Sequence, residues 1–372
     1  MLLIQGRLTF RRKASREKID MGKIYKNFYP QIYDLFNLWL AFDKASKGRR
    51  SHPSIAAFEY HLEPELIRLR DELREQTWRP GGYRSFMVHE PKRRKISAAP
   101  FRDRVVHHAL MNVTGPMLET KFIFDSYANR VGKGTHRALD RCTYFMRRYA
   151  YVLPCDVRQF FPSIDHRILA SILAKTIQDE QAMNLIGKII ASGEGVLEEE
   201  YDMTYFPGDD LFSANRPRGL PIGNLTSQFW ANVYLNELDQ FVKRALKVRA
   251  YLRYVDDFVL FSDDKRELLE WRSAVIEFLA SLRLTIHEES AHARPTWKGI
   301  TFLGFIVFPE HRRLKPSKGY AFRRRWQHLC AMRAQGKMTS EQLRSRAIAW
   351  ANHARYGDTW NLRTKILNSV MS

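Results

Sequence analysis

Two adjacent carboxylates, Asp256 and Asp257, lie inside an otherwise apolar run of β-branched and aromatic residues at positions 251–261. Residues 251–255 and 258–261 are typical of the two strands of a hairpin, which leaves the acidic pair as the predicted turn. Like charges in such a place repel each other and lose hydration unless a cation neutralises them. Carboxylate oxygens with no Cys or His nearby favour Mg²⁺ or Mn²⁺ over Zn²⁺. The alternative is a solvated Asp-Asp turn, and the hairpin alone does not decide between the two.

A third carboxylate, Asp156, ends the apolar run of residues 149–156, which predicts a buried strand. Neighbouring strands lie about 4.8 Å apart, so a shared sheet would place Asp156 beside Asp256 and Asp257. Phosphoryl-transfer sites use such carboxylates to hold two metal ions about 3.5–4 Å apart, one for a 3′-hydroxyl and one for a triphosphate. We include Val157, the next residue, in this predicted metal site. Taken alone, Asp156 is better explained as a strand-end cap.

A glycine-bearing loop, residues 218–228, opens a segment with helical periodicity. Glycine allows close backbone approach at Gly219 and Gly223, and a helix N-terminus suits contact with a phosphate or a base pair. Such turns before helices are common. The loop becomes specific through its position between Asp156 and the acidic hairpin.

Other segments predict the elements that must position these residues. Apolar residues recur at helical spacing in residues 31–45, 54–77, 101–118, 165–175, 228–246 and 265–282. Further strands are predicted at residues 83–89, 284–287 and 300–308, and a loop or hairpin at 193–218. Beyond Pro316 the chain is basic and helical, with a break at Gly336 and an N-cap at Thr339 or Ser340 for a helix over 341–354.

The composition limits the partners and the location. The 372 residues include 61 Lys and Arg against 40 Asp and Glu, a formal net charge of +21. This excess indicates a polyanionic partner, nucleic acid before an acidic membrane surface. No apolar stretch is long enough for a transmembrane helix and no signal peptide is recognisable, so we expect no membrane partner. Cys142, Cys155 and Cys330 lack metal-binding spacing, which argues against structural zinc and fits a reduced, cytoplasmic location.

Five motifs follow one another in an order that makes them specific as a set: residues 91–96, 156–161, 219–228, 254–257 and 299–304. In this order the sequence resembles the reverse transcriptase family, from about residue 41 to the C-terminus. The resemblance implies an α+β fold, a right-hand polymerase with fingers, a palm of antiparallel sheet backed by helices, and a helical thumb. We expect a disordered basic tail at 1–20, an N-terminal helical extension and fingers at 21–148, the palm at 149–310 with part of the fingers near 166–220, and the thumb at 311–372.

The resemblance also implies roles for single residues of the palm. Asp156, Asp256 and Asp257 correspond to a catalytic triad that binds two Mg²⁺ ions, with Mn²⁺ as a substitute. Phe161 resembles the steric gate that packs against the sugar and excludes ribonucleotides, although an ordinary core aromatic is the alternative. The further nucleotide contacts expected in the palm are Ile222, Gly223, Gln228 and Tyr254.

In the fingers, Arg94 resembles the arginine that contacts the incoming triphosphate. Lys92 or Arg93 would stand in for its lysine partner. Arginine suits this role because it binds phosphate oxygens with two parallel hydrogen bonds. The alternative for these residues is a solvated basic turn.

The sequence departs from the family pattern at two places. Most relatives have Gln where this chain has Ile222 and Pro where it has Gln228, and the pattern seen here resembles the enzymes of diversity-generating retroelements and neighbouring bacterial lineages. Ile offers no amide hydrogen bonds near the incoming nucleotide, which predicts low fidelity, particularly opposite template adenine. The lysine that many relatives use to protonate pyrophosphate is replaced by Ser290. His287 or His292 could take its place, or both could be structural or solvated.

Basic residues alternate with aromatic ones in the C-terminal segment, a pattern that can follow a nucleic-acid backbone and stack on bases. An amphipathic helix with a solvated basic face explains much of the same pattern. The predicted nucleic-acid contacts are Arg323, Arg324, Arg325, Trp326, Trp350 and His353.

These expectations together describe an RNA-directed DNA polymerase that makes cDNA from dNTPs on a cognate structured RNA. The favoured setting is a diversity-generating retroelement, in which relatives act with a small basic accessory protein. A rival setting is antiviral defence templated by a noncoding RNA. A rival of another class is a non-catalytic RNA-binding protein on a polymerase scaffold, and retention of three mutually repelling carboxylates argues against it.

Overall fold

The computed structural model describes residues 24–89 and 93–368, so the basic tail expected at 1–20 lies outside the described residues. The centre of the molecule is a four-stranded antiparallel sheet with the strand order β4-β5-β3-β6. Its strands are β3 (Tyr151–Asp156), β4 (Ala250–Tyr254), β5 (Asp257–Ser262) and β6 (Arg294–Pro295). The acidic hairpin and the strand that ends at Asp156 are therefore neighbours in one sheet, as predicted.

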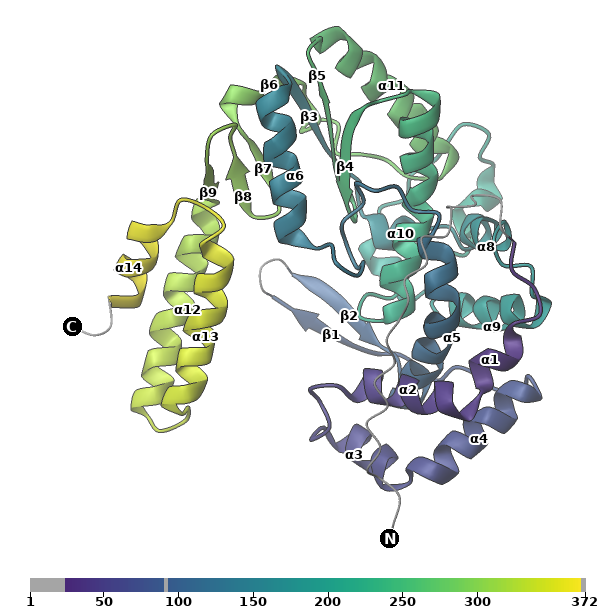
Figure 1. Cartoon of the computed structure of the whole chain (residues 1–372). Helices are drawn as coiled ribbons and strands as arrows, with labels where there is room; N and C mark the ends of the chain where they lie inside the picture. Colours follow the sequence, from purple (N-terminus) through teal and green to yellow (C-terminus); the bar gives the residue numbers. More distant parts are fainter. Residues whose placement is uncertain (1–23, 90–92, 369–372) are drawn as a thin grey trace, which may run out of the picture.

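Helices cover both faces of this sheet, which explains why its strands are apolar on both sides (Figure 1). Val152 of β3 belongs to a core that includes α6 (Thr135–Arg148). The next residue, Leu153, belongs to a core that includes α10 (Leu225–Gln240) and α11 (Lys265–Ser281). Both side chains are fully buried, and each such burial stabilises the fold by about 1.5–3 kcal/mol. Our predictions contain no helix at α6, although the buried residues Ala138, Leu139, Cys142, Phe145 and Met146 recur at helical spacing in the sequence.

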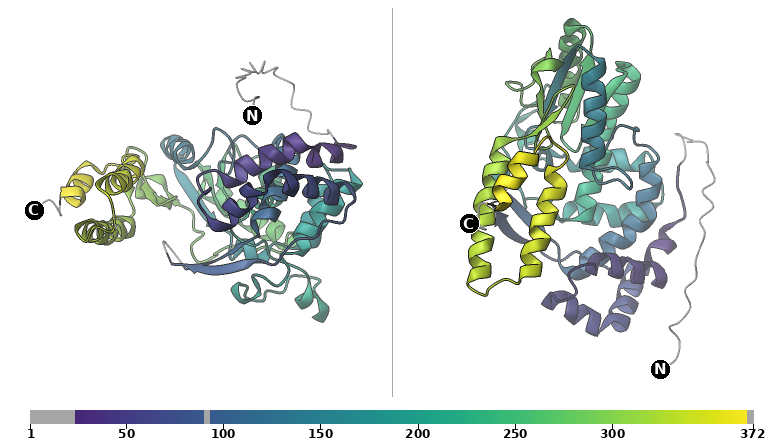
Figure 2. Two further views of the ribbon diagram at one scale, coloured as in Figure 1. Left: turned by 90° about the horizontal axis from the view of Figure 1, so that it is seen from below. Right: turned by 60° about the vertical axis from the view of Figure 1, so that its left-hand side comes forward.

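The N-terminal part is helical and packs around α5 (Phe101–Glu119). A hairpin of β1 (Arg84–Val88) and β2 (Arg94–Ala98) extends from it toward the C-terminal helices (Figure 2). The other helices of this region are α1 (Tyr29–Tyr33), α2 (Leu35–Ser46), α3 (Pro53–Tyr60), α4 (Leu62–Arg74), α7 (Phe160–Ser163), α8 (His166–Ala174), α9 (Glu180–Ala191), η1 (Glu198–Glu200) and η2 (Leu211–Asn215). The helix predicted at 54–77 is two helices, because His61 leaves the helical conformation at φ −109° and ψ 34°.

The C-terminal part combines a small sheet with three helices. The sheet contains β7 (Ile300–Phe302), β8 (Phe305–Val307) and β9 (Arg312–Leu314), so the single strand predicted at 300–308 is in fact a hairpin. Helices α12 (Pro316–Ala334), α13 (Ser340–Ala354) and α14 (Trp360–Asn368) enclose a small apolar core. Thr339 caps α13 as predicted, in a reciprocal pair of hydrogen bonds with Gln342.

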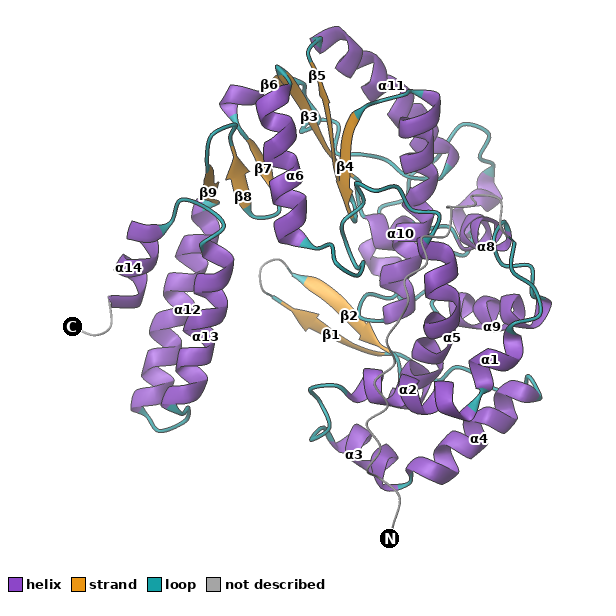
Figure 3. Ribbon diagram, in the orientation of Figure 1, coloured by secondary structure: helices purple, strands orange, loops and turns teal. Residues whose placement is uncertain are grey.

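Figure 3 shows the three parts of the molecule: a mainly helical N-terminal part, the central sheet with the helices that cover it, and a C-terminal part with a small sheet and helices. The α+β fold and the right-hand arrangement of fingers, palm and thumb are confirmed. The exact boundaries of these regions stay predictions. Within the described residues, no helix is both long and apolar enough to span a bilayer.

Candidate active site

The turn of the acidic hairpin differs by one residue from the predicted turn. Tyr254 pairs with Asp257, so Val255 and Asp256 form the turn, and Asp257 is already the first residue of β5. Val255 has a φ of 57°, a left-handed conformation that a β-branched residue adopts only under strain. Arg253 opposes this strain, because its Nη1 donates a hydrogen bond of 3.0 Å to the carbonyl of Val255. This hydrogen bond therefore stabilises the turn at Val255 and Asp256.

The register of the sheet brings the predicted metal-binding residues together. Asp156 lies directly opposite Asp257 in the antiparallel pair of β3 and β5. Residues opposite each other in such a pair share one face, with Cβ atoms about 4.5–5.5 Å apart. The N–H of Val157 donates to the carbonyl of Asp256 at 3.3 Å, so the hairpin turn also contacts the end of β3. All three carboxylate residues are half-buried.

The chemistry of these donors fits a hard divalent cation. Asp156 and Asp257 offer carboxylate oxygens on one face of the sheet, which is the donor type that Mg²⁺ prefers. Among the described residues, however, no group of three or more His, Cys, Asp or Glu side chains is gathered closely enough to hold an ion. The backbone register is therefore suited to a metal, while the three carboxylates do not converge on one point.

A buried ion pair supports the hairpin from the opposite face. Arg253 and Asp239 of α10 are both 0% exposed, and Nη2 of Arg253 lies 2.6 Å from Oδ2 of Asp239. Tyr251 donates its hydroxyl to Asp239 at 2.7 Å, and Nη1 of Arg253 donates to Oδ1 of Asn232 at 3.1 Å. Burial alone would lower the pKa of Arg253, but Asp239 raises it above its ordinary value. The network therefore keeps its charges and fixes β4 against α10.

Our residue predictions missed this network, although the sequence contains a signal for it. Arg253 interrupts an apolar strand, and Asp239 lies on the amphipathic segment 228–246. A buried charge needs a partner, so the two residues could have been paired on charge alone.

The steric-gate candidate and the glycine loop lie side by side. Phe161 is half-buried in α7, and its carbonyl accepts a hydrogen bond of 2.9 Å from the N–H of Leu220. His166 forms a hydrogen bond of 2.7 Å with the carbonyl of Gly219. Burial lowers the pKa of His166, and the ring nitrogen donates this bond, because a carbonyl oxygen can only accept. These contacts hold the loop against the end of β3.

The same loop contacts the fingers hairpin through its backbone. The carbonyl of Ile222 accepts from the N–H of Ser97 in β2 at 2.8 Å. Gly223 has a φ of 120°, and a Cβ there would lie 2.9 Å from Ile96. Asn224, which our predictions overlooked, is 1% exposed and bonds with Ala99 at 3.1 Å and Ser97 at 2.9 Å. Gly223 is therefore required by packing as well as by its backbone conformation.

The remaining residues predicted to contact the nucleotide are distributed over two regions. Arg94 is the first residue of β2, and both it and Arg93 are exposed. Lys92 lies outside the described residues. Tyr254 is half-buried and its hydroxyl lies 3.1 Å from that of Thr135, while Gln228 is half-buried in the first turn of α10.

The residues of the thumb that are predicted to contact nucleic acid divide into exposed and buried side chains. Arg323, Arg324 and Arg325 are exposed on α12, as nucleic-acid contacts must be. Trp326 is 7% exposed and belongs to the thumb core.

The rings of Trp350 and His353 also pack against protein. Trp350 stacks on Phe322 with 3.9 Å between ring centroids. The ring of His353 lies 5.1 Å from that of Phe305 in β8 and 6.0 Å from that of His136 in α6. These rings contribute to packing within the thumb and between thumb and palm.

One histidine lies next to the carboxylates. Val157 bridges Ile286 in an antiparallel pair, and the N–H of His287 donates to the carbonyl of Asp156 at 2.9 Å. Because Val157 lies opposite Ile286 in an antiparallel pair, Asp156 lies opposite His287. His287 is therefore next to Asp156 on the side away from Asp257. His287 is exposed, and so is His292, but His292 has no such place in the register.

An antiparallel sheet that presents paired carboxylates, bordered by a fingers hairpin and followed by a helical thumb, defines a nucleic-acid polymerase. The sequence matches the family described as reverse transcriptase (RNA-dependent DNA polymerase) over residues 88–307, which is more than half of the chain. The chain belongs to the reverse transcriptase family of RNA-directed DNA polymerases.

Curated relatives agree with this assignment. Protein YkfC of Escherichia coli (strain K12) is 26% identical over 294 residues, which cover 68% of this chain and 73% of that protein. Group II intron-encoded protein LtrA of Lactococcus lactis subsp. cremoris is 26% identical over 239 residues, which cover 62% of this chain and 37% of LtrA. The chain therefore matches little more than a third of the length of LtrA.

Solved structures include the apo telomerase from Candida tropicalis, which is similar at a TM-score of 0.45 and 11% identity. The similarity covers 62% of this chain and 48% of that one.

Proposed function

We propose that this protein copies a cognate structured RNA into cDNA by metal-dependent nucleotidyl transfer at Asp156, Asp256 and Asp257. The observation that carries the proposal is the strand register, which pairs Asp156 with Asp257 and puts Asp256 in the adjoining turn. Like charges at these neighbouring positions repel one another, and a divalent cation would lower that repulsion. When bound, Mg²⁺ would activate the 3′-hydroxyl of the primer and neutralise charge on the triphosphate.

In this proposal the other residues bind and orient the substrates. Arg94 on β2 would bind the triphosphate, and its exposure leaves its guanidinium accessible. Phe161 would pack against the deoxyribose, supported by the loop that contacts its backbone. Primer extension on an RNA template with dNTPs and Mg²⁺ tests the function directly, and an inert protein under these conditions would overturn it.

We propose His287 as the group that protonates the pyrophosphate leaving group, supported by its place beside Asp156. His287→Ala is expected to lower the single-turnover rate at least tenfold, since general acids contribute about 10²–10⁴-fold. Single-turnover rates measure the effect, with His292→Ala as the matched control. Equal rates for His287→Ala and wild type would assign proton donation elsewhere.

Ile222 supports the proposal of low fidelity. Its backbone is fixed by Ser97, but its side chain cannot donate or accept a hydrogen bond beside the nucleotide. Ile222→Gln is expected to lower misincorporation opposite template adenine by about tenfold, the effect of roughly one 1.4 kcal/mol hydrogen bond. Sequencing of cDNA from both proteins measures this, and unchanged error frequencies would contradict it.

The biological setting that we propose is a diversity-generating retroelement in the cytoplasm, with a small basic accessory protein as partner. The pattern from Ile222 to Gln228 supports it. Sequencing the RNA and cDNA that copurify with the protein tests it, because cDNA mutated at adenines is expected. Faithful copies of one noncoding RNA would instead favour the antiviral setting.

A further inference from the structure

Asn224 occupies the N-cap position of α10, but its side chain does not cap the helix. Asparagine is preferred at this position because its side-chain oxygen accepts a hydrogen bond from an N–H of the first helical turn. Within the described residues, Asn224 forms no such bond. The residue is 1% exposed, and a buried amide needs hydrogen-bond partners. Its partners must therefore lie outside the helix that it begins.

The amide of Asn224 pairs with the backbone of the fingers hairpin. Its Oδ1 accepts a hydrogen bond of 3.1 Å from the N–H of Ala99, and its Nδ2 donates to the carbonyl of Ser97 at 2.9 Å. The carbonyl of Ile222 accepts from the N–H of Ser97 at 2.8 Å. Three hydrogen bonds thus join the end of β2 to the loop before α10, across 125 residues of chain between Ala99 and Asn224. We call this contact the fingers joint.

The fingers joint is closed to solvent. Ser97 is 0% exposed and Ala99 is 5% exposed. The hydroxyl of Ser97 lies 2.8 Å from that of Ser85, so the joint is also connected to β1. A buried N–H that loses its acceptor is costly, because water cannot take the place of the lost partner. The side chain of Asn224 therefore holds β2 firmly at this point.

Another contact between the hairpin and the rest of the protein is weaker. Nζ of Lys95 in β2 lies 3.4 Å from Oε2 of Glu199 in η1, but the side chain of Glu199 is 85% exposed. Exposed ion pairs contribute little to stability and are screened by salt. The hydroxyl of Tyr83, which lies 3.0 Å from that of Ser192, acts just before β1 and not on β2. We therefore expect the fingers joint to set the position of β2.

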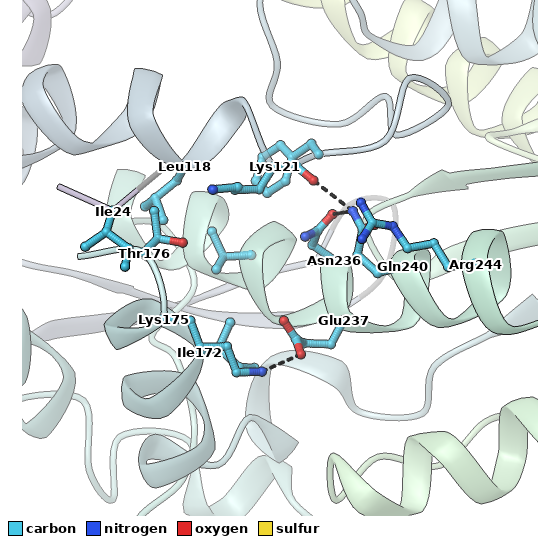
Figure 4. Close-up of a pocket in the computed structure, with 12 residues that line it drawn as sticks. Ile24, Leu118, Lys121, Ile172, Lys175, Thr176, Asn236, Glu237, Gln240 and Arg244 are labelled. Carbon is cyan, nitrogen blue, oxygen red and sulfur yellow. Dashed lines mark hydrogen bonds and ion pairs between the residues drawn. The ribbon is translucent and has the colours of Figure 1, made fainter. Parts of the chain in front are cut away.

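Helix α10 gives the fingers joint a fixed base, because the far end of the helix is anchored as well. The amide of Gln240 donates to the carbonyl of Lys121 at 2.9 Å. This contact lies in a pocket of about 390 Å³ between α5, α8 and α10 (Figure 4). One residue earlier, Asp239 pairs with Arg253 of the acidic hairpin. The same helix is thus joined to the carboxylate turn near one end and to the fingers hairpin at the other.

We propose that Asn224 is a positioning residue that fixes the fingers hairpin relative to the carboxylates of the palm. Arg94 lies three residues before Ser97 on β2, which is about 10 Å along a strand. Over that length, a rotation of about 10° at the joint would move Arg94 by about 2 Å, and errors of about 1 Å are enough to weaken a contact with substrate. Asn224 is buried, so it acts on the substrate through β2. The proposal rests on the proposed function, in which Arg94 binds the triphosphate.

The variant Asn224→Ser tests the joint with little disturbance of α10. Serine is also a preferred N-cap residue, but its one short hydroxyl cannot reproduce the two bonds of the amide to β2. The matched control is Asn37→Ser in α2. Asn224 and Asn37 each take part in three side-chain hydrogen bonds, and those of Asn37 go to α1 and α5 instead of the hairpin.

Hydrogen–deuterium exchange measures the joint without any catalysis. In Asn224→Ser, the backbone N–H groups of residues 94–99 are expected to exchange at least about tenfold faster than in the wild type, because Ala99 loses its acceptor. In Asn37→Ser the same groups should exchange at the wild-type rate. Thermal unfolding of both variants shows whether the rest of the protein is equally stable.

Primer extension measures the consequence for the nucleotide. In Asn224→Ser the KM for dNTP is expected to rise about tenfold while kcat changes less than about threefold, as for a contact made equally in ground state and transition state. Asn37→Ser should keep both constants. Arg94→Ala should also raise the KM, and adding Asn224→Ser to it should raise the KM no further, because both substitutions remove the same contact.

Three results would overturn the proposal. Equal exchange of residues 94–99 in Asn224→Ser and Asn37→Ser would show that the amide does not hold the hairpin. An unchanged KM for dNTP in Asn224→Ser would show that the joint does not position the triphosphate contact. A further rise in KM when Asn224→Ser is added to Arg94→Ala would show that Asn224 acts independently of Arg94. A wild type that extends no primer would refute the polymerase function alone, and hydrogen exchange would still decide whether Asn224 holds the hairpin.

Discussion

Replacing Asp256 by Asn is expected to lower the rate of primer extension by at least about 10³-fold while the protein stays folded. A carboxylate that binds a catalytic metal contributes several kcal/mol to transition-state stabilisation, and each 1.4 kcal/mol is about tenfold in rate. Asn keeps the shape of the side chain in the Val255–Asp256 turn and removes only its charge. Since Asp257 follows directly, the substitution also removes a repulsion between like charges.

Two measurements separate this loss from misfolding. Single-turnover extension gives the rate, and thermal unfolding with and without Mg²⁺ reports metal binding without any catalysis. Mg²⁺ should raise the Tm of the wild type by mass action and raise that of Asp256→Asn less. The matched control is Asp358→Asn, an exposed carboxylate in the loop between α13 and α14. Extension by Asp256→Asn at the wild-type rate would remove Asp256 from the mechanism.

The second large effect is expected at Arg253, which no substrate needs to touch. Arg253→Met should lower the free energy of unfolding by about 3–5 kcal/mol, because it leaves Asp239 charged and fully buried without its partner. The variant also loses the hydrogen bond to the carbonyl of Val255, which holds the strained turn. Both stability and extension should therefore fall. Urea unfolding and single-turnover extension measure the two effects.

A double variant distinguishes the two roles of Arg253. Arg253→Met/Asp239→Leu removes both buried charges and should recover most of the lost stability, since apolar replacements of buried ion pairs are often neutral. Extension should stay low, because the turn still lacks its donor from Arg253. Arg158→Met is the control for stability, because its ion pair with Asp202 at 2.7 Å is exposed and worth at most about 1 kcal/mol. Full recovery of extension in the double variant would show that the turn does not need Arg253.

Local sequence patterns predicted most of the elements that surround the site. The strands on both sides of the acidic turn, the strand before Asp156 and helix α5 all form where apolar period and turn residues place them. The cap of α13 at Thr339 also forms as predicted, because a capping box involves residues only three positions apart. Such features are encoded within one or two turns of chain.

Errors arose where a distant residue decides the local conformation. The turn of the hairpin lies one residue earlier than predicted, where Arg253 donates to the carbonyl of Val255 and is itself held by Asp239 of α10. The burial of Trp326 depends on α13 and α14, which pack around it in the thumb. Neither fact is visible in a short window of sequence.

The amino-acid sequence shows that three carboxylates end or join apolar strands, that the chain is basic, and that its motifs follow the order of a reverse transcriptase. The folded chain is needed to show which carboxylates face each other, which histidine lies beside Asp156, and that the side chain of Asn224 bonds to the fingers hairpin. The difference is the distance along the chain over which each interaction acts. Periodicity and capping involve residues that are only a few positions apart. Strand register and the pairing of buried charges can join groups that lie about a hundred residues apart in the chain.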